Sequence, residues 1–585
     1  MADNLRPLLQ PTLRWIVLLL GLGGGSAALY AYRKNLIARL LHIEPPRCGY
    51  QLEKDIAIPM WDGVRLYADH YAPDEGKRAP VVLIRSPYGR NLDYSAFGGL
   101  LGFFATRFAE RGYHVIVQDV RGRSTSEGEF DPYLNEKTDG QDTVAWLREQ
   151  PWFDGQIVLW GSSYLGVVQW ALADCIPEIK AMMPIFTSSH LKEVIFPDGV
   201  FDYGLAMRWV SIFQVLDEYA GRTLPEMAPV PFAVERRAES ALMHLPVDEG
   251  DSIAIGQPST FYRKWMAHSA PDDPLWDEIV ETVQVDRIST AVHMVGGWYD
   301  FFLRGQIRDY LALRARGLSP YLTIGPWTHF SDLNGLLTGM REGLMWFDHH
   351  VKDAPLDRDC PVRLYVMGED EGWHDFPDYP PPHRLDSLYL SCSGLESEPV
   401  QDEHTHEYTY DPAEPTPMLG GNQFRFDLFP VKDNRVLEQR SDVLAFTGDV
   451  LAHQLEIIGP VRAVLYTKTS APSTDFFARL CDVTPDGRSL NVCDGLFRIG
   501  PDTSQPDADG IHRIEIDLWY TAYRFAAGHR VRLLVSSGAH PRWLRNPGTG
   551  EHDVSGRKLV VQHETVFTGG KTPSHLILPV TIGDR

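Results

Sequence analysis

Apolar and polar residues between positions 51 and 185 alternate between strand-like and helix-like patterns. Short apolar runs typical of buried strands are separated by segments with the spacing of an amphipathic helix. The predicted strands are 80–85, 113–118 and 156–160, and the predicted helices between them are 97–111 and 138–150. Because parallel strands need such crossover connections, we predict a parallel α/β sheet, preceded by a hairpin over Ala57–Pro73.

Two later regions have different patterns. From about 190 to 285 the strand signal stops, and helical pieces broken by prolines predict a helical insertion. Strand runs at 291–295 and 321–324 then resume the α/β alternation. After about 355, short β-rich runs separated by Pro, Gly and Asp turns favour a β-sandwich of the jelly-roll kind. The predicted sandwich strands include Val362–Met367, Ser387–Leu390, Leu455–Tyr466 and Val531–Ser537.

The N-terminal stretch has the pattern of a membrane segment. Residues 15–32 are uncharged, with Arg14 before them and Arg33 after them. As a helix this stretch would be roughly 27 Å long, which is enough to cross a hydrocarbon core. We predict an uncleaved single-span transmembrane helix followed by a tether over 35–47, with a cleavable signal peptide as the alternative. Basic residues on both sides leave the orientation open.

Composition narrows the functional classes. Of the 585 residues, 44% are hydrophobic and 23% charged, which is an ordinary globular balance. The net charge of −23 and the lack of a basic run argue against nucleic-acid binding. The six cysteines have no CxxC spacing, which argues against structural zinc. A disulfide between Cys481 and Cys493 stays open if the compartment is oxidising.

The turn after the strand at 156–160 carries a candidate nucleophile. Residues 159–166 read Leu-Trp-Gly-Ser-Ser-Tyr-Leu-Gly, a strand that runs into a helix. A nucleophile elbow lifts a serine above the sheet, and Ser163 fits this pattern with Gly161 two positions before it. The usual glycine two positions after the serine is Leu165 here, and glycine follows at Gly166.

A serine nucleophile needs a base and a carboxylate that orients the base. Asp300 follows the predicted strand at 291–295, and His329 follows the one at 321–324. Both residues therefore lie just past the carboxyl end of a strand, where ligands meet a parallel sheet. Taken singly, Asp300 could cap a helix and His329 is one of 21 histidines. The order Ser, Asp, His together predicts a catalytic triad.

These residues carry a resemblance. The sequence resembles the cocaine esterase / X-Pro dipeptidyl-peptidase (peptidase S15) family of serine hydrolases over about residues 50–585. The family elbow, Gly-x-Ser-Tyr-x-Gly, accounts for Leu165. Further matches are Arg85–Gly89, Asp119–Gly128, Gly297–Asp300, Gly325–His329, Ser441–Leu444, Asp475–Ala478 and Gly528–Arg545.

The resemblance implies roles for individual residues. Ser163 would be the nucleophile, His329 the general base and then acid, and Asp300 its orienting partner. The oxyanion hole would be formed by the Tyr88 hydroxyl and the backbone N–H of Tyr164. The implied mechanism needs no cofactor and no metal.

The resemblance also implies an α/β-hydrolase core interrupted by a helical cap and followed by a β-sandwich. The expected regions are a membrane anchor at 1–47, a first core part at 48–189, a cap at 190–285, a second core part at 286–355 and a C-terminal β-sandwich domain at 356–585.

The residues after Asp300 bear on the substrate. Relatives that cleave α-amino acid esters look to carry acidic residues there, whereas this chain has Phe301 and Phe302. We therefore expect an ester, or a simple amide, with an apolar or aromatic acyl group. The candidate substrate-binding residues are Phe301, Phe302, Trp298 and Trp327, with Trp209 and Phe213 of the cap as further lining residues. Each aromatic could equally be a core residue.

Two other functions stay open. One is an X-Pro type dipeptidyl-peptidase acting on short peptides with the same triad, in which Asp217 and Glu218 of the cap would hold the substrate ammonium. The other is a membrane-tethered binding protein with a vestigial hydrolase. An intact triad with an oxyanion tyrosine argues against the second function.

Overall fold

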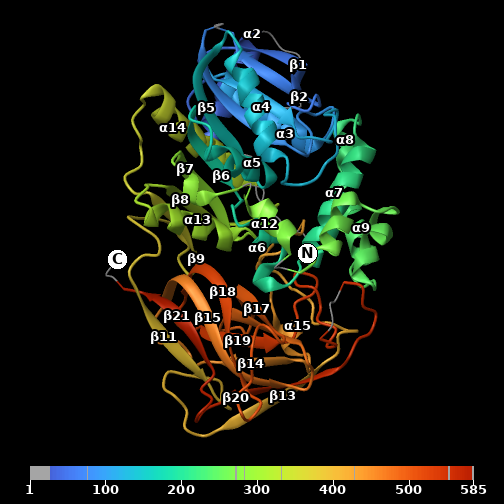
Figure 1. Ribbon diagram of the computed structural model, residues 1–585. Helices are drawn as coiled ribbons and strands as arrows, with labels where there is room; N and C mark the ends of the chain where they lie inside the picture. The colour runs from blue at the N-terminus through green and yellow to red at the C-terminus, as the bar shows by residue number, and fades with distance from the viewer. Residues whose placement is uncertain are drawn as a thin grey trace.

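The computed structural model describes residues 27–74, 77–270, 273–281, 283–330, 333–426, 429–550 and 554–582. Figure 1 shows an α/β region whose first part is blue and teal and whose second part is yellow-green, a helical region in green beside it, and a β-rich region in orange and red below.

The first region is built on one long sheet. Pairing gives the order β1-β2-β4-β3-β5-β6-β7-β8-β9-β10, in which the strands from β4 to β9 run parallel. The strands are β1 (Tyr50–Pro59), β2 (Arg65–Pro73), β3 (Ala79–Ser86), β4 (His114–Asp119), β5 (Phe153–Ser162), β6 (Ile179–Ile185), β7 (Ala291–Tyr299), β8 (Tyr321–Thr328), β9 (Val362–Gly368) and β10 (Gly372–Phe376). Central strands such as β4 are buried along their whole length, as expected for a sheet covered on both faces.

Helices connect the parallel strands and flank the sheet (Figure 1). They are α3 (Ala96–Ala109), α4 (Glu136–Arg148), α5 (Tyr164–Ala173), α13 (Leu303–Ala315) and α14 (Leu333–Lys352). These bounds agree with the predicted helices at 97–111 and 138–150. The α/β-hydrolase architecture expected from the sequence is therefore present.

The helical region is inserted between β6 and β7, as the loss of strand signal predicted. It comprises α6 (Leu191–Ile195), η2 (Pro197–Gly199), α7 (Tyr203–Tyr219), α8 (Leu224–Met227), α9 (Val230–Ala241), η3 (Val247–Glu249), α10 (Gly250–Ile255), α11 (Thr260–Ala267), α12 (Pro274–Glu281) and η4 (Val285–Arg287). Its longest helix, α7, begins where the Asp202 carboxylate accepts a hydrogen bond from the Leu205 N–H at 2.8 Å. We refer to this region as the cap.

The C-terminal region contains two antiparallel sheets. In one, β12-β11-β21-β15 pair in that order, and β15 also pairs with β18 and β20, which carries β13. The other has the order β14-β19-β16-β17. The elements are β11 (His383–Leu390), β12 (Leu395–Glu396), β13 (His404–Tyr410), α15 (Arg435–Glu438), β14 (Val443–Thr447), β15 (Leu455–Thr469), β16 (Thr474–Val483), β17 (Ser489–Ile499), β18 (His512–Phe525), β19 (Arg530–Ser536), β20 (Gln562–Thr568) and β21 (His575–Thr581).

The strand β9 lies elsewhere than expected. We predicted Val362–Met367 as a strand of the C-terminal region, but it pairs parallel with β8, with Leu322 opposite Val362. Its last residues also pair with β18, where Met367 lies opposite Tyr523. A short apolar run fits the edge of either sheet, so the sequence pattern alone could not assign it.

The predicted membrane location is wrong. Residues 15–26 of the proposed span lie outside the described residues, and the chain continues as α2 (Ala27–Leu41). In α2, Ile37 and Leu41 are buried against the α/β region, and Lys34 pairs with Glu110 at 2.9 Å. The segment taken as a tether is thus packed on this region. Nowhere in the described part of the chain does a helix combine the length and apolar character that a membrane crossing needs.

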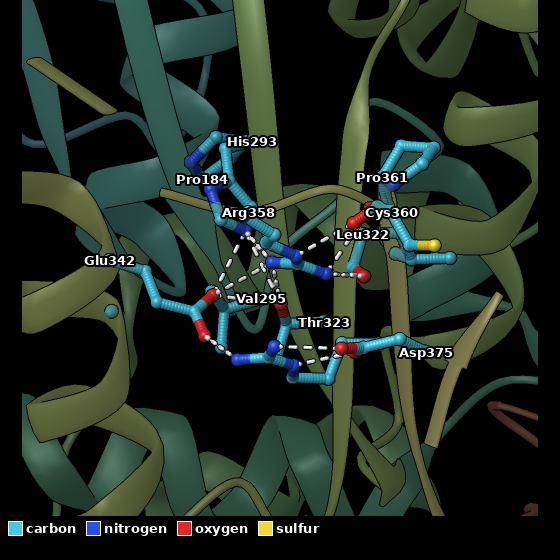
Figure 2. A network of polar contacts seen from close by, with 12 residues as sticks. Pro184, His293, Val295, Leu322, Thr323, Glu342, Arg358, Cys360, Pro361 and Asp375 are labelled. Atoms are coloured by element: carbon cyan, nitrogen blue, oxygen red, sulfur yellow. Dashed lines mark hydrogen bonds and ion pairs between the residues drawn. The ribbon is translucent and has the colours of Figure 1, made fainter. Parts of the chain in front are cut away.

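A buried ionic network ties together the part of the α/β sheet that contains β7, β8 and β9 (Figure 2). The Glu342 carboxylate of α14 contacts His293 Nε2 at 2.9 Å and accepts a hydrogen bond from the Thr323 hydroxyl at 2.7 Å. The Arg358 guanidinium pairs with Glu342 and donates to the Leu322 carbonyl at 3.1 Å. The network therefore joins β7, β8 and α14 to the segment that leads into β9.

Candidate active site

The turn between β5 and α5 holds Ser163 in a strained backbone conformation. Its φ of 58° and ψ of −126° lie in a region that non-glycine residues rarely adopt. The turn is close-packed, because a Cβ on Gly161 would lie 2.5 Å from Leu165 Cβ and one on Gly166 would lie 2.2 Å from Thr187 Cγ2. These two close approaches explain why glycine stands at both positions of the predicted elbow.

Ser163, His329 and Asp300 form one hydrogen-bonded chain. His329 Nε2 lies 2.9 Å from Ser163 Oγ, and His329 Nδ1 lies 2.7 Å from Asp300 Oδ2. Asp300 is 1% exposed, and its other oxygen accepts a hydrogen bond from the Phe302 N–H at 2.8 Å. The carboxylate is thus fixed by the first turn after β7, and it faces the imidazole at the end of β8. The structure brings the three predicted residues together.

Two tyrosines share the cleft with Ser163. Tyr88 and Tyr164 both line the cleft that contains the serine hydroxyl. Tyr164 is the first residue of α5, where backbone N–H groups have no partner within their own helix. Burial raises the pKa of Tyr88 to about 12, so its hydroxyl stays protonated and can donate at neutral pH.

The Tyr164 hydroxyl is held by buried hydrogen bonds. It donates to the Glu136 carboxylate at 2.7 Å and accepts from the Tyr133 N–H at 3.1 Å. Glu136 also pairs with Arg85 at 3.1 Å. This buried anchor holds the first residue of α5, directly after Ser163.

The cleft at Ser163 has mostly aromatic walls. Its lining residues are Tyr88, Tyr133, Ser163, Tyr164, Val194, Leu205, Trp209, Phe301, Phe302 and Phe424. They come from the α/β region, the cap and the C-terminal region. Such a cleft suits an apolar group next to the reactive hydroxyl.

Two of the four predicted substrate-binding residues lie in this cleft and two do not. Phe301 and Phe302 line it, with ring centroids 4.5 Å and 5.7 Å from that of His329. Trp298 lines a second cavity instead, and its indole donates to the Tyr365 carbonyl at 2.7 Å. Trp327 packs on Trp373 at 5.7 Å. Both tryptophans stand on β7 and β8, two residues before a triad residue, and their indoles pack toward β9 and β10, whereas Phe301 and Phe302 belong to the turn after β7.

Sequence reasoning missed Phe424, which reaches the triad from the C-terminal region. It is 5% exposed, and its ring centroid lies 5.3 Å from that of Phe301 and 5.6 Å from that of His329. It stands in an irregular segment between β13 and α15. No strand or helix pattern marks this segment, so nothing in the sequence pointed to it.

Comparison with known proteins identifies the family. The profile of the X-Pro dipeptidyl-peptidase (S15 family) matches residues 62–331, and that of the X-Pro dipeptidyl-peptidase C-terminal non-catalytic domain matches residues 355–577. The chain is 32% identical over 579 residues to the cocaine esterase of Rhodococcus sp. (strain MB1 Bresler), covering 91% of this chain and 99% of the relative. The chain belongs to the S15 family. It is a serine hydrolase, as its sequence motifs predicted.

Solved structures with the same fold include other hydrolases. An α-amino acid ester hydrolase labelled with selenomethionine superposes with a TM-score of 0.76 at 25% identity, covering 92% of this chain and 98% of that one. An aminopeptidase from a marine sediment Thaumarchaeota archaeon gives a TM-score of 0.74 at 22% identity, covering 92% and 97%. The likeness to both extends over the α/β, cap and C-terminal regions of this S15 chain.

Asp217 and Glu218, the two residues that would hold a substrate ammonium, form ion pairs with arginines instead. Asp217 pairs with Arg123 at 2.8 Å, and Glu218 pairs with Arg237 at 2.8 Å. Neither carboxylate lines the cleft at Ser163. In this S15 chain the pair is therefore neutralised outside the cleft.

The thiols of Cys481 and Cys493 are both free, although they lie on the neighbouring strands β16 and β17. Within the described ranges, no group of three or more His, Cys, Asp or Glu residues is placed to hold a metal ion.

Proposed function

We propose that this chain hydrolyses carboxylic esters, or simple amides, with an apolar or aromatic acyl group through an acyl-enzyme on Ser163. The proposal rests on one observation, the hydrogen-bonded chain from Asp300 through His329 to Ser163 at the floor of an aromatic cleft. The S15 membership and the similarity to a cocaine esterase support it.

In the first half-reaction Ser163 Oγ attacks the carbonyl carbon of the substrate, and its proton passes to His329 Nε2. Asp300 holds the Nδ1–H of the imidazole, so that Nε2 is free to accept this proton, and stabilises the imidazolium that forms. The tetrahedral intermediate collapses with loss of the alcohol or amine, which takes the proton from Nε2. The acyl group is left on Ser163 as an ester.

In the second half-reaction water attacks the acyl-enzyme. His329 Nε2 takes one proton from the water and returns it to Ser163 Oγ as the carboxylic acid leaves. The sum is hydrolysis of one ester or amide bond, and the residues end in their starting protonation states.

The negative charge of the tetrahedral intermediates needs donors that are fixed beforehand. We assign this role to the Tyr88 hydroxyl and the Tyr164 backbone N–H. Donors aimed at a developing oxyanion in a dry site stabilise the transition state more than the ground state, and removing one costs about 10²–10³ in kcat.

The acyl group would occupy the aromatic part of the cleft. The rings of Phe301, Phe302 and Phe424 pack near the His329 imidazole, and Trp209 and Leu205 of the cap line the same cleft. No carboxylate lines this cleft among the described residues, which favours an uncharged acyl group over one that carries an ammonium.

The test compares the full chain with its Ser163→Ala variant. We expect turnover of p-nitrophenyl esters that rises from acetyl to longer or benzoyl groups, and its loss in the variant. Undiminished ester turnover by Ser163→Ala would refute the proposed nucleophile.

A second candidate function is an X-Pro type dipeptidyl-peptidase, favoured by the family profiles that match both parts of the chain. Such an enzyme would bind the free amino terminus of a peptide. The pairing of Asp217 and Glu218 with arginines argues for the esterase instead. Ala-Pro-p-nitroanilide separates the two functions, because exclusive cleavage of this substrate would establish the peptidase.

A further inference from the structure

We propose that Trp209, on the cap helix α7, is a positioning residue whose indole N–H turns the Tyr88 hydroxyl proton toward the oxyanion that forms at Ser163. This inference rests on the proposed function and adds to it a role for the cap in completing the oxyanion hole.

The direction of one hydrogen bond carries the inference. Trp209 Nε1 lies 3.1 Å from the Tyr88 hydroxyl oxygen. An indole N–H can only donate, so the tyrosine oxygen must be the acceptor in this pair. The hydroxyl proton of Tyr88 is then free to point elsewhere, and both groups line the cleft with Ser163.

The indole itself is held firmly in place. Trp209 is 4% exposed, and its ring stacks on Tyr133 with centroids 5.9 Å apart and on Trp265 at 5.5 Å. These near-parallel neighbours fix the plane of the ring, and with it the direction of the N–H. A donor fixed in this way costs little entropy when the oxyanion forms.

Two more residues on the same stripe of α7 hold the segment around Tyr88. Trp209, Phe213 and Asp217 are four residues apart, a spacing that places side chains on one face of a helix. The Phe213 ring stacks on the Tyr88 ring with centroids 5.8 Å apart and an interplanar angle of 13°. The helix face thus covers both the hydroxyl and the ring of the tyrosine.

Asp217 acts through Arg123. The arginine pairs with Asp217 at 2.8 Å, its guanidinium lies 4.6 Å from the Phe213 ring centroid, and its Nε donates to the Pro87 carbonyl at 3.1 Å. Pro87 immediately precedes Tyr88. Through Arg123, the cap therefore acts on the backbone next to Tyr88 as well as on the Tyr88 side chain.

The α/β region holds the backbone of Tyr88, and Phe97 of α3 packs edge-on against its ring with centroids 5.5 Å apart. The Tyr88 N–H donates to Ser86 Oγ at 3.1 Å, and Ser95 Oγ donates to the Tyr88 carbonyl at 2.5 Å. The hydroxyl receives its hydrogen bond from Trp209 of the cap. We infer that the α/β region positions Tyr88 and that the cap orients its hydroxyl proton.

The test is a double-mutant cycle between Trp209→Phe and Tyr88→Phe, measured with p-nitrophenyl acetate. The small acyl group makes the lining role of Trp209 unimportant. We expect Tyr88→Phe to lower kcat about 10²–10³-fold. Trp209→Phe should lower kcat about three- to tenfold with little change in KM, because one net hydrogen bond is lost. In the Tyr88→Phe background, Trp209→Phe should cost less than about twofold, because the oxygen that it would orient is gone.

Trp276→Phe is the matched control. It removes a buried indole of the same aromatic cluster that packs on Trp265 and Phe196, one ring removed from Trp209, so kcat should stay within about twofold of the unaltered chain. A loss equal to that of Trp209→Phe would show general loosening of the cap and overturn the inference. Equal losses from Trp209→Phe in both backgrounds would overturn it too.

Two further measurements keep the result interpretable. If Trp209→Phe fails to fold, replacing the indole of Trp209 by benzothiophene removes only the N–H and keeps the ring shape. Full turnover by that protein would overturn the inference, and a three- to tenfold loss would support it. Ester turnover that survives Ser163→Ala would overturn the proposed function itself, whereas Ser163-dependent turnover with an additive cycle would overturn only the role of Trp209.

Discussion

Replacing Glu342 by glutamine tests whether the buried network in Figure 2 stabilises the part of the α/β sheet that contains β7, β8 and β9. One Glu342 oxygen faces His293 at 2.9 Å, Thr323 at 2.7 Å and Arg358 at 3.3 Å. Glu342→Gln keeps the size of the side chain but removes its charge. The Arg358 side chain, 2% exposed, would then stay buried without its counter-charge.

Removing one partner of a buried ion pair typically costs about 3–5 kcal/mol. The same network offers an exposed control, since Arg363 and Asp375 form an ion pair at 2.7 Å with side chains 34% and 42% exposed. Asp375→Asn should therefore cost less than about 1 kcal/mol. The two substitutions make the same chemical change in two different environments.

The assay is urea unfolding followed by intrinsic fluorescence, with ester turnover as a second probe of the α/β region. We expect the first unfolding transition of Glu342→Gln to move to clearly lower urea, while that of Asp375→Asn stays near the unaltered chain. Equal midpoints for the two variants would refute the reasoning that burial decides the cost.

Three more outcomes are expected. Asp300→Asn should lower kcat about 10⁴-fold at unchanged thermal stability, because a neutral amide no longer holds His329 in the tautomer that can accept the serine proton. Steady-state kinetics check the loss of kcat, and a calorimetric melting curve checks the stability. Phe424→Ala should lower kcat/KM for a benzoyl ester about 10–100-fold more than for an acetyl ester, because the aromatic acyl group loses a buried apolar contact; equal losses on both esters would contradict its place in the acyl site. Burial favours a raised pKa for Glu342, but its hydrogen bond with His293 and the charges of His293 and Arg358 lower the pKa from 4.5 to about 2. Its stabilising effect is then complete above pH 4.5 and is lost as the pH falls toward 2, so acid unfolding of Glu342→Gln should depend less on pH in that window.

The elements that sequence reasoning located best are those that carry the triad. Ser163, Asp300 and His329 each follow a buried strand directly, and strands of a parallel sheet present their carboxyl ends at one edge. The apolar runs were long enough to be recognised, and their topology then placed the three residues near one another without any knowledge of side-chain packing.

The walls of the cleft could not be predicted in the same way. Trp298 and Trp327 stand two positions before Asp300 and His329 in sequence but pack toward β9 and β10, a difference that no sequence pattern marks. Phe424 lies 95 residues after His329 in an irregular segment, and only tertiary packing brings it to the imidazole. The uncharged N-terminal stretch had the composition of a span, yet α2, which begins within it at Ala27, buries Ile37 and Leu41 against the α/β region.

The position of Phe424 has a consequence for how such chains diversify. A residue of the C-terminal region forms part of the wall beside the imidazole, so insertions or exchanges in that irregular segment reshape the cleft while leaving the sheet and the elbow untouched. Recombination that joins the α/β region to a foreign C-terminal region would preserve the reacting atoms but replace one wall of the cleft. Selection for a new substrate can therefore act on a part of the chain that never takes part in bond making or breaking.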